Sequence, residues 1–486
     1  MKDIQFLLCL ILVYTPVSVL RAQTSIAADD PNIQYLGRFD LTTPAAPAFD
    51  WSYCCISAKF QGTSCSVKLG GPSKYFDLYV DGVKTGSLKS TNGGLETLPV
   101  ASGLADGAHR VALYRRDEAS KGLNTFQGFV LDAGKALVAP DARPCRKLEF
   151  IGDSFTCGYG DEAAYGASFS YATENACITY AAQMANHYNA DCMITAWSGK
   201  GMVRNYGAST QTSPDPMPYY YARTCGSVAT NNYAFTWQPD VVVVVLGIND
   251  FSTSPNPSPA QYVGGYSNFV KTLRGYYPSA DIICTRLSSM AGSASNYIWA
   301  VVNTSGDSKV HFASVSYTLV NPTDLGADGH PNLSGQTKIA NAFIPVFDGI
   351  MGTSWGSAPH GTPLTWLRSY GFTNDFALAE EGDPDGDGMR TWEEYRAGTD
   401  PTNAASVFRL HEIAPVANGI RLAWSGTTNS GVTTPFLMYC ATNLSSPAWK
   451  LISGSIPRAG NGLNVWTDSV PPSRTQVFYR VAVPAR

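Results

Sequence analysis

The sequence predicts a multidomain protein with an N-terminal β-sandwich, a central three-layer α/β domain on a parallel sheet, and a small C-terminal β module. Three observations support this prediction. Residues 33–140 alternate with period two and turn about every eight to twelve residues. After Cys145, apolar strands alternate with helical patterns, as in a parallel sheet covered by helices. Alternation returns in residues 405–486, and 486 residues that are 44% hydrophobic suffice for several cores.

Residues 1–22 predict a secretory signal peptide. Lys2 precedes an apolar run at 6–13, and we expect cleavage after Ala22. No other stretch approaches the roughly 18 consecutive apolar residues of a membrane span. The net charge of -4, without a basic run, gives no electrostatic case for nucleic-acid binding. We therefore expect a secreted protein, extracellular or periplasmic, whose oligomeric state the sequence does not indicate.

Export affects how the cysteines are interpreted. Of the eleven cysteines, Cys9 lies in the signal segment and ten remain. An even number in an exported chain predicts several disulfides, although sequence alone does not give their connectivity. The ten are Cys54, Cys55, Cys65, Cys145, Cys157, Cys177, Cys192, Cys225, Cys284 and Cys440.

The β-sandwich at 33–140 is predicted from short alternating segments bounded by turn residues. On its own, such a sandwich serves either as a binding module or as a platform. Its expected strands are 56–60, 66–69, 76–80, 109–114 and 126–131.

The α/β domain is expected at 141–352. The run 241–246 is apolar without alternation, which indicates a parallel strand covered on both faces. Helical patterns occur around 262–273 and 339–350. The expected strands are 148–151, 192–197, 240–247, 281–287 and 309–315.

Polar loops follow these strands. Ser154 follows the first, 198–201 the second, and 247–250 the third, while 328–332 precedes the last helix. Because ligands of parallel α/β sheets bind beyond the carboxyl ends of the strands, we expect these loops to form one site.

Ser154 is the candidate nucleophile, and a serine hydroxyl needs a base within hydrogen-bonding reach. Of the six histidines, only His330 lies in a loop at this end of the sheet, and Asp328 is the nearest carboxylate that could orient its ring. Acyl transfer also needs donors for the developing oxyanion. The candidates are the Ser154 amide, an amide at Gly199 or Gly201, and the Asn249 side chain.

These blocks, in order, resemble the SGNH (GDSL) hydrolase superfamily: Gly152-Asp153-Ser154, the glycine of the second loop, Gly247-Ile248-Asn249-Asp250 and His330. The N-terminal segments 126–129 and 131–132, with Gly158-Tyr159-Gly160, are similar to carbohydrate esterase family 2. The resemblance covers about residues 34–352. It implies a jelly-roll sandwich joined to an SGNH domain, and an enzyme that removes acetyl groups from plant polysaccharides.

By the same resemblance, Ser154 is the nucleophile, His330 the base, and Ser154, Gly199 or Gly201 and Asn249 form the oxyanion hole. The superfamily places its acid three residues before the histidine, where this chain has Ala327. Asp328 lies two residues before it, as in family members that work as a Ser-His dyad. Gly329 stands where some relatives carry an aromatic residue.

We therefore predict a serine esterase acting on O-acetylated polysaccharide or oligosaccharide through an acetyl-enzyme, with no cofactor for catalysis. Tyr159 and Tyr165 are expected to contact sugar. Two alternatives remain: an SGNH lipase or lysophospholipase, and a catalytically inactive carbohydrate-binding or surface-attachment protein. An α/β-hydrolase is disfavoured, because the residues around Ser154 lack the second glycine of that fold's nucleophile elbow.

The linker 353–404 contains a twelve-residue register typical of a calcium loop. Oxygen ligands fall at alternating positions and Gly388 at the sharp turn. We expect structural calcium away from catalysis. The expected ligands are Asp383, Asp385, Asp387, the Met389 carbonyl, Thr391 and Glu394.

Overall fold

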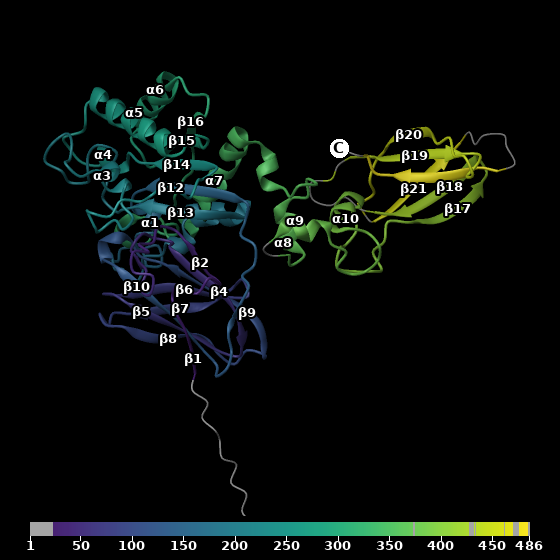
Figure 1. The fold of residues 1–486 in the computed structure, drawn as a ribbon. Helices are drawn as coiled ribbons and strands as arrows, with labels where there is room; N and C mark the ends of the chain where they lie inside the picture. The colour runs from purple at the N-terminus through teal and green to yellow at the C-terminus, as the bar shows by residue number, and fades with distance from the viewer. Residues whose placement is uncertain are drawn as a thin grey trace, which may run out of the picture.

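The computed structural model describes residues 23–372, 375–426, 432, 434–460, 462–469 and 476–484. The predicted signal peptide at 1–22 lies outside the described residues. Figure 1 shows the N-terminal sheets beneath the α/β domain, with short helices leading to a separate pair of small sheets. No helix in the described ranges is long and apolar enough to cross a membrane.

The predicted N-terminal β-sandwich is confirmed. One sheet has the order β1-β10-β5-β8 with β3 on β10, and the other the order β11-β4-β9-β6-β7 with β2 on β4. The strand β1 at the N-terminal edge precedes the predicted start of the domain. The strands are β1 (Thr24–Ile26), β2 (Ile33–Leu36), β3 (Ala48–Phe49), β4 (Cys55–Gly62), β5 (Cys65–Gly70), β6 (Lys74–Val80), β7 (Val83–Ser90), β8 (Glu96–Ala101), β9 (Gly107–Arg115), β10 (Asn124–Leu131) and β11 (Leu137–Val138), with the 3-10 turn η1 (Ala119–Lys121).

The predicted parallel sheet is also confirmed, in the order β13-β12-β14-β15-β16. This order places the topological switch point beside β12, where open α/β sheets bind their ligands. Every residue of β14 is fully buried, as the unbroken valine run predicted. The strands are β12 (Arg146–Gly152), β13 (Ala190–Ala196), β14 (Val241–Val245), β15 (Asp281–Leu287) and β16 (Val310–Val315).

Helices connect and cover these strands. The longest two, α5 and α7, bury apolar faces that include Phe269 and Phe343. The elements are α1 (Ser154–Cys157), η2 (Ala176–Ile178), α2 (Tyr180–Tyr188), α3 (Met217–Tyr221), α4 (Ile248–Phe251), α5 (Pro259–Tyr276), α6 (Gly292–Ser305), η3 (Ala327–Gly329) and α7 (Leu333–Met351).

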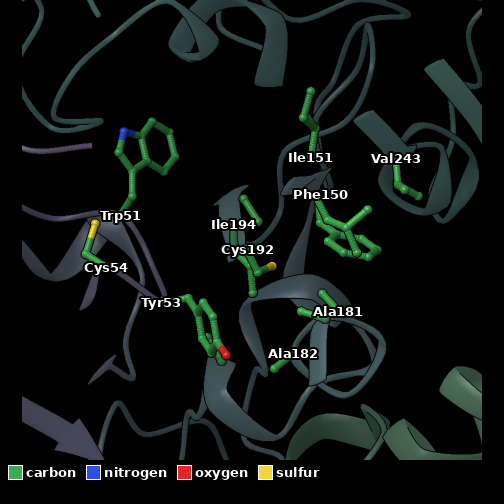
Figure 2. Packing of buried hydrophobic residues seen from close by; sticks show 14 of the residues in the cluster. Trp51, Tyr53, Cys54, Phe150, Ile151, Ala181, Ala182, Cys192, Ile194 and Val243 are labelled. Atoms are coloured by element: carbon green, nitrogen blue, oxygen red, sulfur yellow. The ribbon is translucent and has the colours of Figure 1, made fainter. Parts of the chain in front are cut away.

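The sandwich and the α/β domain share one hydrophobic core. Figure 2 shows Tyr53 of the sandwich beside Cys192 of β13. The Trp51 ring packs edge-on against Trp197, the residue after β13. The Arg38 guanidinium lies 3.0 Å from the Glu149 carboxylate of β12, and both side chains are fully buried. A buried charge left without its partner is strongly destabilising, so this ion pair makes the two domains interdependent.

The segment after α7 has its own small core around Trp366 and Leu367. It contains η4 (Thr353–Gly356), α8 (Leu364–Ser369), α9 (Phe376–Glu381) and α10 (Thr391–Ala397). The C-terminal module then forms two antiparallel sheets, β17-β18-β21 and β20-β19-β22. Its strands are β17 (Leu410–Val416), β18 (Gly419–Ser425), β19 (Phe436–Ala441), β20 (Lys450–Ile456), β21 (Leu463–Asp468) and β22 (Phe478–Ala482).

The predicted disulfides do not form. All ten cysteines in the described part of the chain are free thiols, and only Cys145 is exposed. The other nine are buried; Cys54 and Cys225 lie in loops, and the rest lie on different helices or strands, such as Cys192 on β13 and Cys284 on β15. A free cysteine packs as a small apolar side chain, which accounts for this placement without bridges.

Candidate active site

Ser154 is held at the point where β12 becomes α1. Asp153 caps the helix, its Oδ1 accepting from the Phe155 amide at 3.2 Å. A Cβ at Gly152 would lie 2.0 Å from Thr156 Oγ1, so the glycine allows the chain to turn this tightly. Ser154 is 5% exposed, which leaves its hydroxyl shielded at the edge of the sheet.

His330 meets this serine, as predicted from its loop. Its Nε2 lies 2.9 Å from Ser154 Oγ, although 176 residues separate the two along the chain. The histidine loop packs on the Gly158-Tyr159-Gly160 turn, where a Cβ at Gly160 would lie 2.2 Å from the Ala327 Cβ. The pair therefore has the spacing of a nucleophile and its general base.

Asp328 does not orient the histidine through its carboxylate. Its Oδ2 accepts hydrogen bonds from the Tyr159 hydroxyl and the Phe169 amide, both at 3.0 Å. Asp328 adopts a left-handed conformation with φ 48°, followed by Gly329 with φ 74°, and this turn carries the carboxylate away from the ring. The Asp328 carboxylate therefore makes its hydrogen bonds to Tyr159 and Phe169, and a catalytic role for this side chain stays a prediction.

Tyr159 instead links Asp328 to the histidine. Its ring lies over the His330 ring with centroids 4.2 Å apart, and it stacks on Phe169 at 4.1 Å on its other face. Both faces of the Tyr159 ring are therefore covered by neighbouring rings, and the sugar contact expected of Tyr159 stays a prediction. This tilted stacking restricts the rotation of the imidazole. In a Ser-His-Asp triad, a carboxylate that is hydrogen-bonded to the ring has this role.

Burial lowers the pKa of His330 below its ordinary value of 6.5. The carbonyls of Ala327 and Asp328 and the Asp328 charge oppose this shift without reversing it. The buried Nδ1 forms no hydrogen bond within the described part of the chain, so the carbonyls act on it at longer range. The ring is therefore neutral near pH 7, the state in which Nε2 can accept the Ser154 proton.

The candidate oxyanion donors lie in loops that start at the same level of the sheet. Gly152 is in register with Ala196 of β13 and with Val245 of β14, so the loops after all three strands start side by side. Asn249 donates one amide hydrogen to the Lys200 carbonyl at 2.8 Å and has a second to offer.

The two glycines of the second loop differ. The Gly201 amide donates to Asn205 Oδ1 at 3.3 Å, whereas the Gly199 amide donates no hydrogen bond to any described residue. Gly199 has φ 77°, a left-handed conformation that glycine adopts readily. Of the two predicted alternatives, the geometry favours Gly199 as the backbone donor.

Two acidic residues beside the nucleophile are structural. Asp250 accepts from the amides of Met202, Val203 and Arg204 at 2.8 to 2.9 Å and so fixes the second loop. Burial raises the pKa of Asp250 to about 6 and that of Asp153 to about 7. Both residues lie in the motifs singled out from the sequence, but their role is to shape the loops.

Sequence reasoning missed Glu118, which comes from the sandwich. Its Oε2 accepts from the Ser198 amide at 2.6 Å, one residue before Gly199. The two residues are 80 positions apart, and no local pattern around Glu118 signals the contact. The sandwich therefore helps to form the active site.

Exposed tyrosines lie on the same loops. Tyr165 is 50% exposed, and its hydroxyl accepts from Asn321 at 2.9 Å. Tyr206 is 63% exposed, and its amide donates to the Gly199 carbonyl at 2.9 Å. Tyr206 was not singled out from the sequence, yet it lies closer along the chain to the candidate oxyanion hole than Tyr165 does.

The model of the family described as carbohydrate esterase 2 N-terminal matches residues 35–140. That of the GDSL-like lipase/acylhydrolase family matches residues 150–338. Both halves of the resemblance noted in the sequence are thus found, and the matches include Ser154 and His330.

Among curated relatives, the cellulase/esterase CelE of Acetivibrio thermocellus is 37% identical over 324 residues, 64% of this chain but only 39% of its own length. An acetylxylan esterase / glucomannan deacetylase of Cellvibrio japonicus is 30% identical, covering 62% of this chain and 85% of the relative. A family two carbohydrate esterase from Clostridium thermocellum, solved in complex with cellohexaose, is 34% identical with a TM-score of 0.61, covering 66% of this chain and 99% of that structure.

Proposed function

Because the chain belongs to carbohydrate esterase family 2, and is thereby a carboxylic ester hydrolase, we propose that it removes O-acetyl groups from plant-type polysaccharides or oligosaccharides. The observation that carries this proposal is the 2.9 Å contact between Ser154 Oγ and His330 Nε2. The Cellvibrio japonicus relative is named an acetylxylan esterase / glucomannan deacetylase, which supports this substrate class.

The reaction proceeds through an acetyl-enzyme. The Ser154 hydroxyl gives its proton to His330 Nε2 as its oxygen attacks the acetyl carbonyl carbon. The Ser154 amide, the Gly199 amide and the Asn249 side chain stabilise the resulting oxyanion. The tetrahedral intermediate then collapses, the C–O bond to the sugar breaks, and His330 protonates the sugar oxygen. Water repeats the sequence on the acetyl-enzyme, which releases acetate and restores Ser154.

His330 is oriented here without a carboxylate. The ring is held between Ser154 and Tyr159, and the nearby Ala327 and Asp328 carbonyls favour a proton on Nδ1. That tautomer leaves Nε2 free to accept the serine proton. The site is therefore a Ser-His dyad, with Asp328 acting through Tyr159.

Affinity for the substrate comes mainly from its sugar, since an acetyl group offers little surface to bind. Tyr165 and Tyr206 expose aromatic faces on the active-site loops, and such faces stack on the apolar faces of sugars. We assign them this role, in place of Tyr159.

The protein acts outside the cytoplasm, which is supported by the signal-like segment at 1–22.

Acetate release tests the proposal. The purified chain is assayed on acetylated xylan, acetylated glucomannan and acetylated oligosaccharides, beside long-chain 4-nitrophenyl esters and a lysophospholipid. The expected result is turnover of the acetylated carbohydrates, lost by several orders of magnitude in both Ser154→Ala and His330→Ala. His411→Ala, in the C-terminal module, is the matched control and should retain full activity.

Preference for the long-chain esters or the lipid would instead identify a lipase-type enzyme. Binding of acetylated xylan or cellohexaose without acetate release would identify a carbohydrate-binding protein. If Ser154→Ala retains more than about a tenth of the activity, the assigned nucleophile is wrong.

A further inference from the structure

A group of carboxylates outside the active site remains without a role in the esterase reaction. It lies in the loop between α9 and α10. Carboxylate oxygens of Asp383, Asp385 and Asp387 lie within 4.8 Å of one another. Three negative charges this close repel each other unless a cation is bound among them.

Glu394, the twelfth residue of the loop, adds a fourth carboxylate. It lies on α10 and is fully buried, with its Oε2 unpaired among the described residues. Its other oxygen, Oε1, accepts from the Thr399 hydroxyl at 3.3 Å. The Glu394 carboxylate also interacts electrostatically with Asp383, Asp385 and Asp387, although it comes from a different element.

The loop also leaves specific oxygens unused. Asp383 accepts from the amides of Gly386 and Gly388 at 2.9 Å, which bends the backbone around its carboxylate. Asp385 and Asp387 each use one oxygen to accept a nearby amide. Their other oxygens, both Oδ2 atoms, are buried and have no partner in the described ranges. Buried carboxylate oxygens without donors are costly, because they have lost water without replacement.

We propose that residues 383–394 bind one calcium ion through Asp383, Asp385, Asp387, the Met389 carbonyl and Glu394, and that the ion fixes α10 against the loop. Calcium prefers six to eight oxygen ligands in flexible geometry, with carboxylates at alternating positions and a bidentate glutamate at the twelfth. Gly388, at the sixth position, has the left-handed φ of 94° that the sharp turn requires.

Thr391, at the ninth position, where either its hydroxyl or a water could coordinate the ion, is hydrogen-bonded within the loop. Its hydroxyl donates to the Gly382 carbonyl at 3.2 Å, and its amide donates to the same carbonyl at 2.9 Å. These two bonds close the loop at its base. We therefore assign Thr391 to loop closure, and water completes the coordination.

Fixing α10 has a structural consequence, because this helix joins the linker to the C-terminal module. Tyr395 packs on Trp366 of the linker core, with ring centroids 5.0 Å apart. At the helix end, Arg458 of the C-terminal module donates to the Ala397 carbonyl at 2.9 Å. The ion therefore stabilises the attachment of this module, and it does not contact the esterase site.

Calorimetric titration of the EDTA-treated full chain with calcium chloride tests the proposal. One site per chain is expected. Glu394→Gln and Asp385→Asn should each weaken binding by more than about 100-fold, beyond the 10- to 100-fold typical of outer-shell groups. Glu393→Gln, the control, carries the same charge change one residue away and keeps its carbonyl oxygen as acceptor for the Arg390 amide.

Limited proteolysis of the same samples separates a structural ion from a weakly held one. Cleavage within 353–404 should accelerate in EDTA and slow again when calcium is restored, while hydrolysis of an acetyl ester stays unchanged. The proposal is overturned if wild type shows no calcium binding, if Glu394→Gln binds as tightly as Glu393→Gln, or if EDTA leaves cleavage unaffected. Calcium binding and EDTA-dependent cleavage are both measured on the wild-type protein, so the test can be made even if a variant fails to fold.

Discussion

The Tyr159 hydroxyl donates a 3.0 Å hydrogen bond to Asp328 Oδ2, while the Tyr159 ring lies 4.2 Å from the His330 ring between centroids. The carboxylate nearest the base in sequence thus acts on it through a tyrosine. This arrangement distinguishes the site from a Ser-His-Asp triad, in which the carboxylate accepts directly from the imidazole.

Asp328→Asn should therefore reduce kcat far less than His330→Ala. Loss of the orienting carboxylate costs about ten-thousandfold in a triad. Here the Tyr159 ring remains stacked on the imidazole, so we expect a loss below about 100-fold. Tyr159→Phe keeps the ring and removes only the donor, and it should match Asp328→Asn. Steady-state kinetics on 4-nitrophenyl acetate measures all three, and equal losses in Asp328→Asn and His330→Ala would contradict the dyad.

The acid limb of kcat/KM should lie below pH 6.5. Activity needs the neutral imidazole, and burial lowers the pKa of His330, so protonation begins to remove activity only at lower pH. The Asp328 charge raises this pKa, so Asp328→Asn should move the limb to still lower pH. A pH profile of kcat/KM, recorded for wild type and for Asp328→Asn, measures the acid limb of each protein. Movement to higher pH would show that Asp328 does not act on His330 in this way.

Asn249→Ala should lower kcat by about 100- to 1000-fold with a smaller change in KM, because an oxyanion donor acts mainly in the transition state. Asn443→Ala, on the exposed C-terminal module, serves as the control. Kinetics on an acetylated oligosaccharide separates the two constants. A loss confined to KM would place Asn249 in substrate binding instead.

Glu118→Ala should lower kcat although the residue belongs to the sandwich. Its Oε2 accepts from the Ser198 amide at 2.6 Å, and alanine has no side-chain acceptor to replace it. The displaced loop would misplace Gly199, and a shift of about 1 Å can cost about 100-fold. Thermal unfolding run beside the kinetics separates this effect from general instability. Unchanged kcat with a lowered Tm would make Glu118 purely structural.

Much of the site could be predicted from sequence because it depends on strand ends. Ser154 and Asn249 directly follow apolar strands, and His330 is the only histidine in a loop at that end of the sheet. The Asp328 contact could not be predicted, because it depends on two successive left-handed residues that turn the carboxylate toward Tyr159. Glu118 could not be predicted either, since it reaches the loop from another domain.

The cysteines show a further limit of sequence reasoning. Their even number in an exported chain predicted disulfides, whereas nine of them are buried as free thiols. Composition gives the number of thiols but not the distances between them, and these depend on which strands become neighbours.

The shared core of the sandwich and the α/β domain has a consequence for how the protein unfolds. With Arg38 and Glu149 fully buried between them, neither domain can open without exposing an unpaired charge and the Trp51 surface. We therefore expect the two to unfold as one cooperative unit in calorimetry, and the C-terminal module, with its separate core around Trp424 and Phe436, to unfold in a transition of its own. The sandwich is therefore not a detachable accessory: a chain shortened from its N-terminal end would lose the stability of the catalytic domain together with the sandwich.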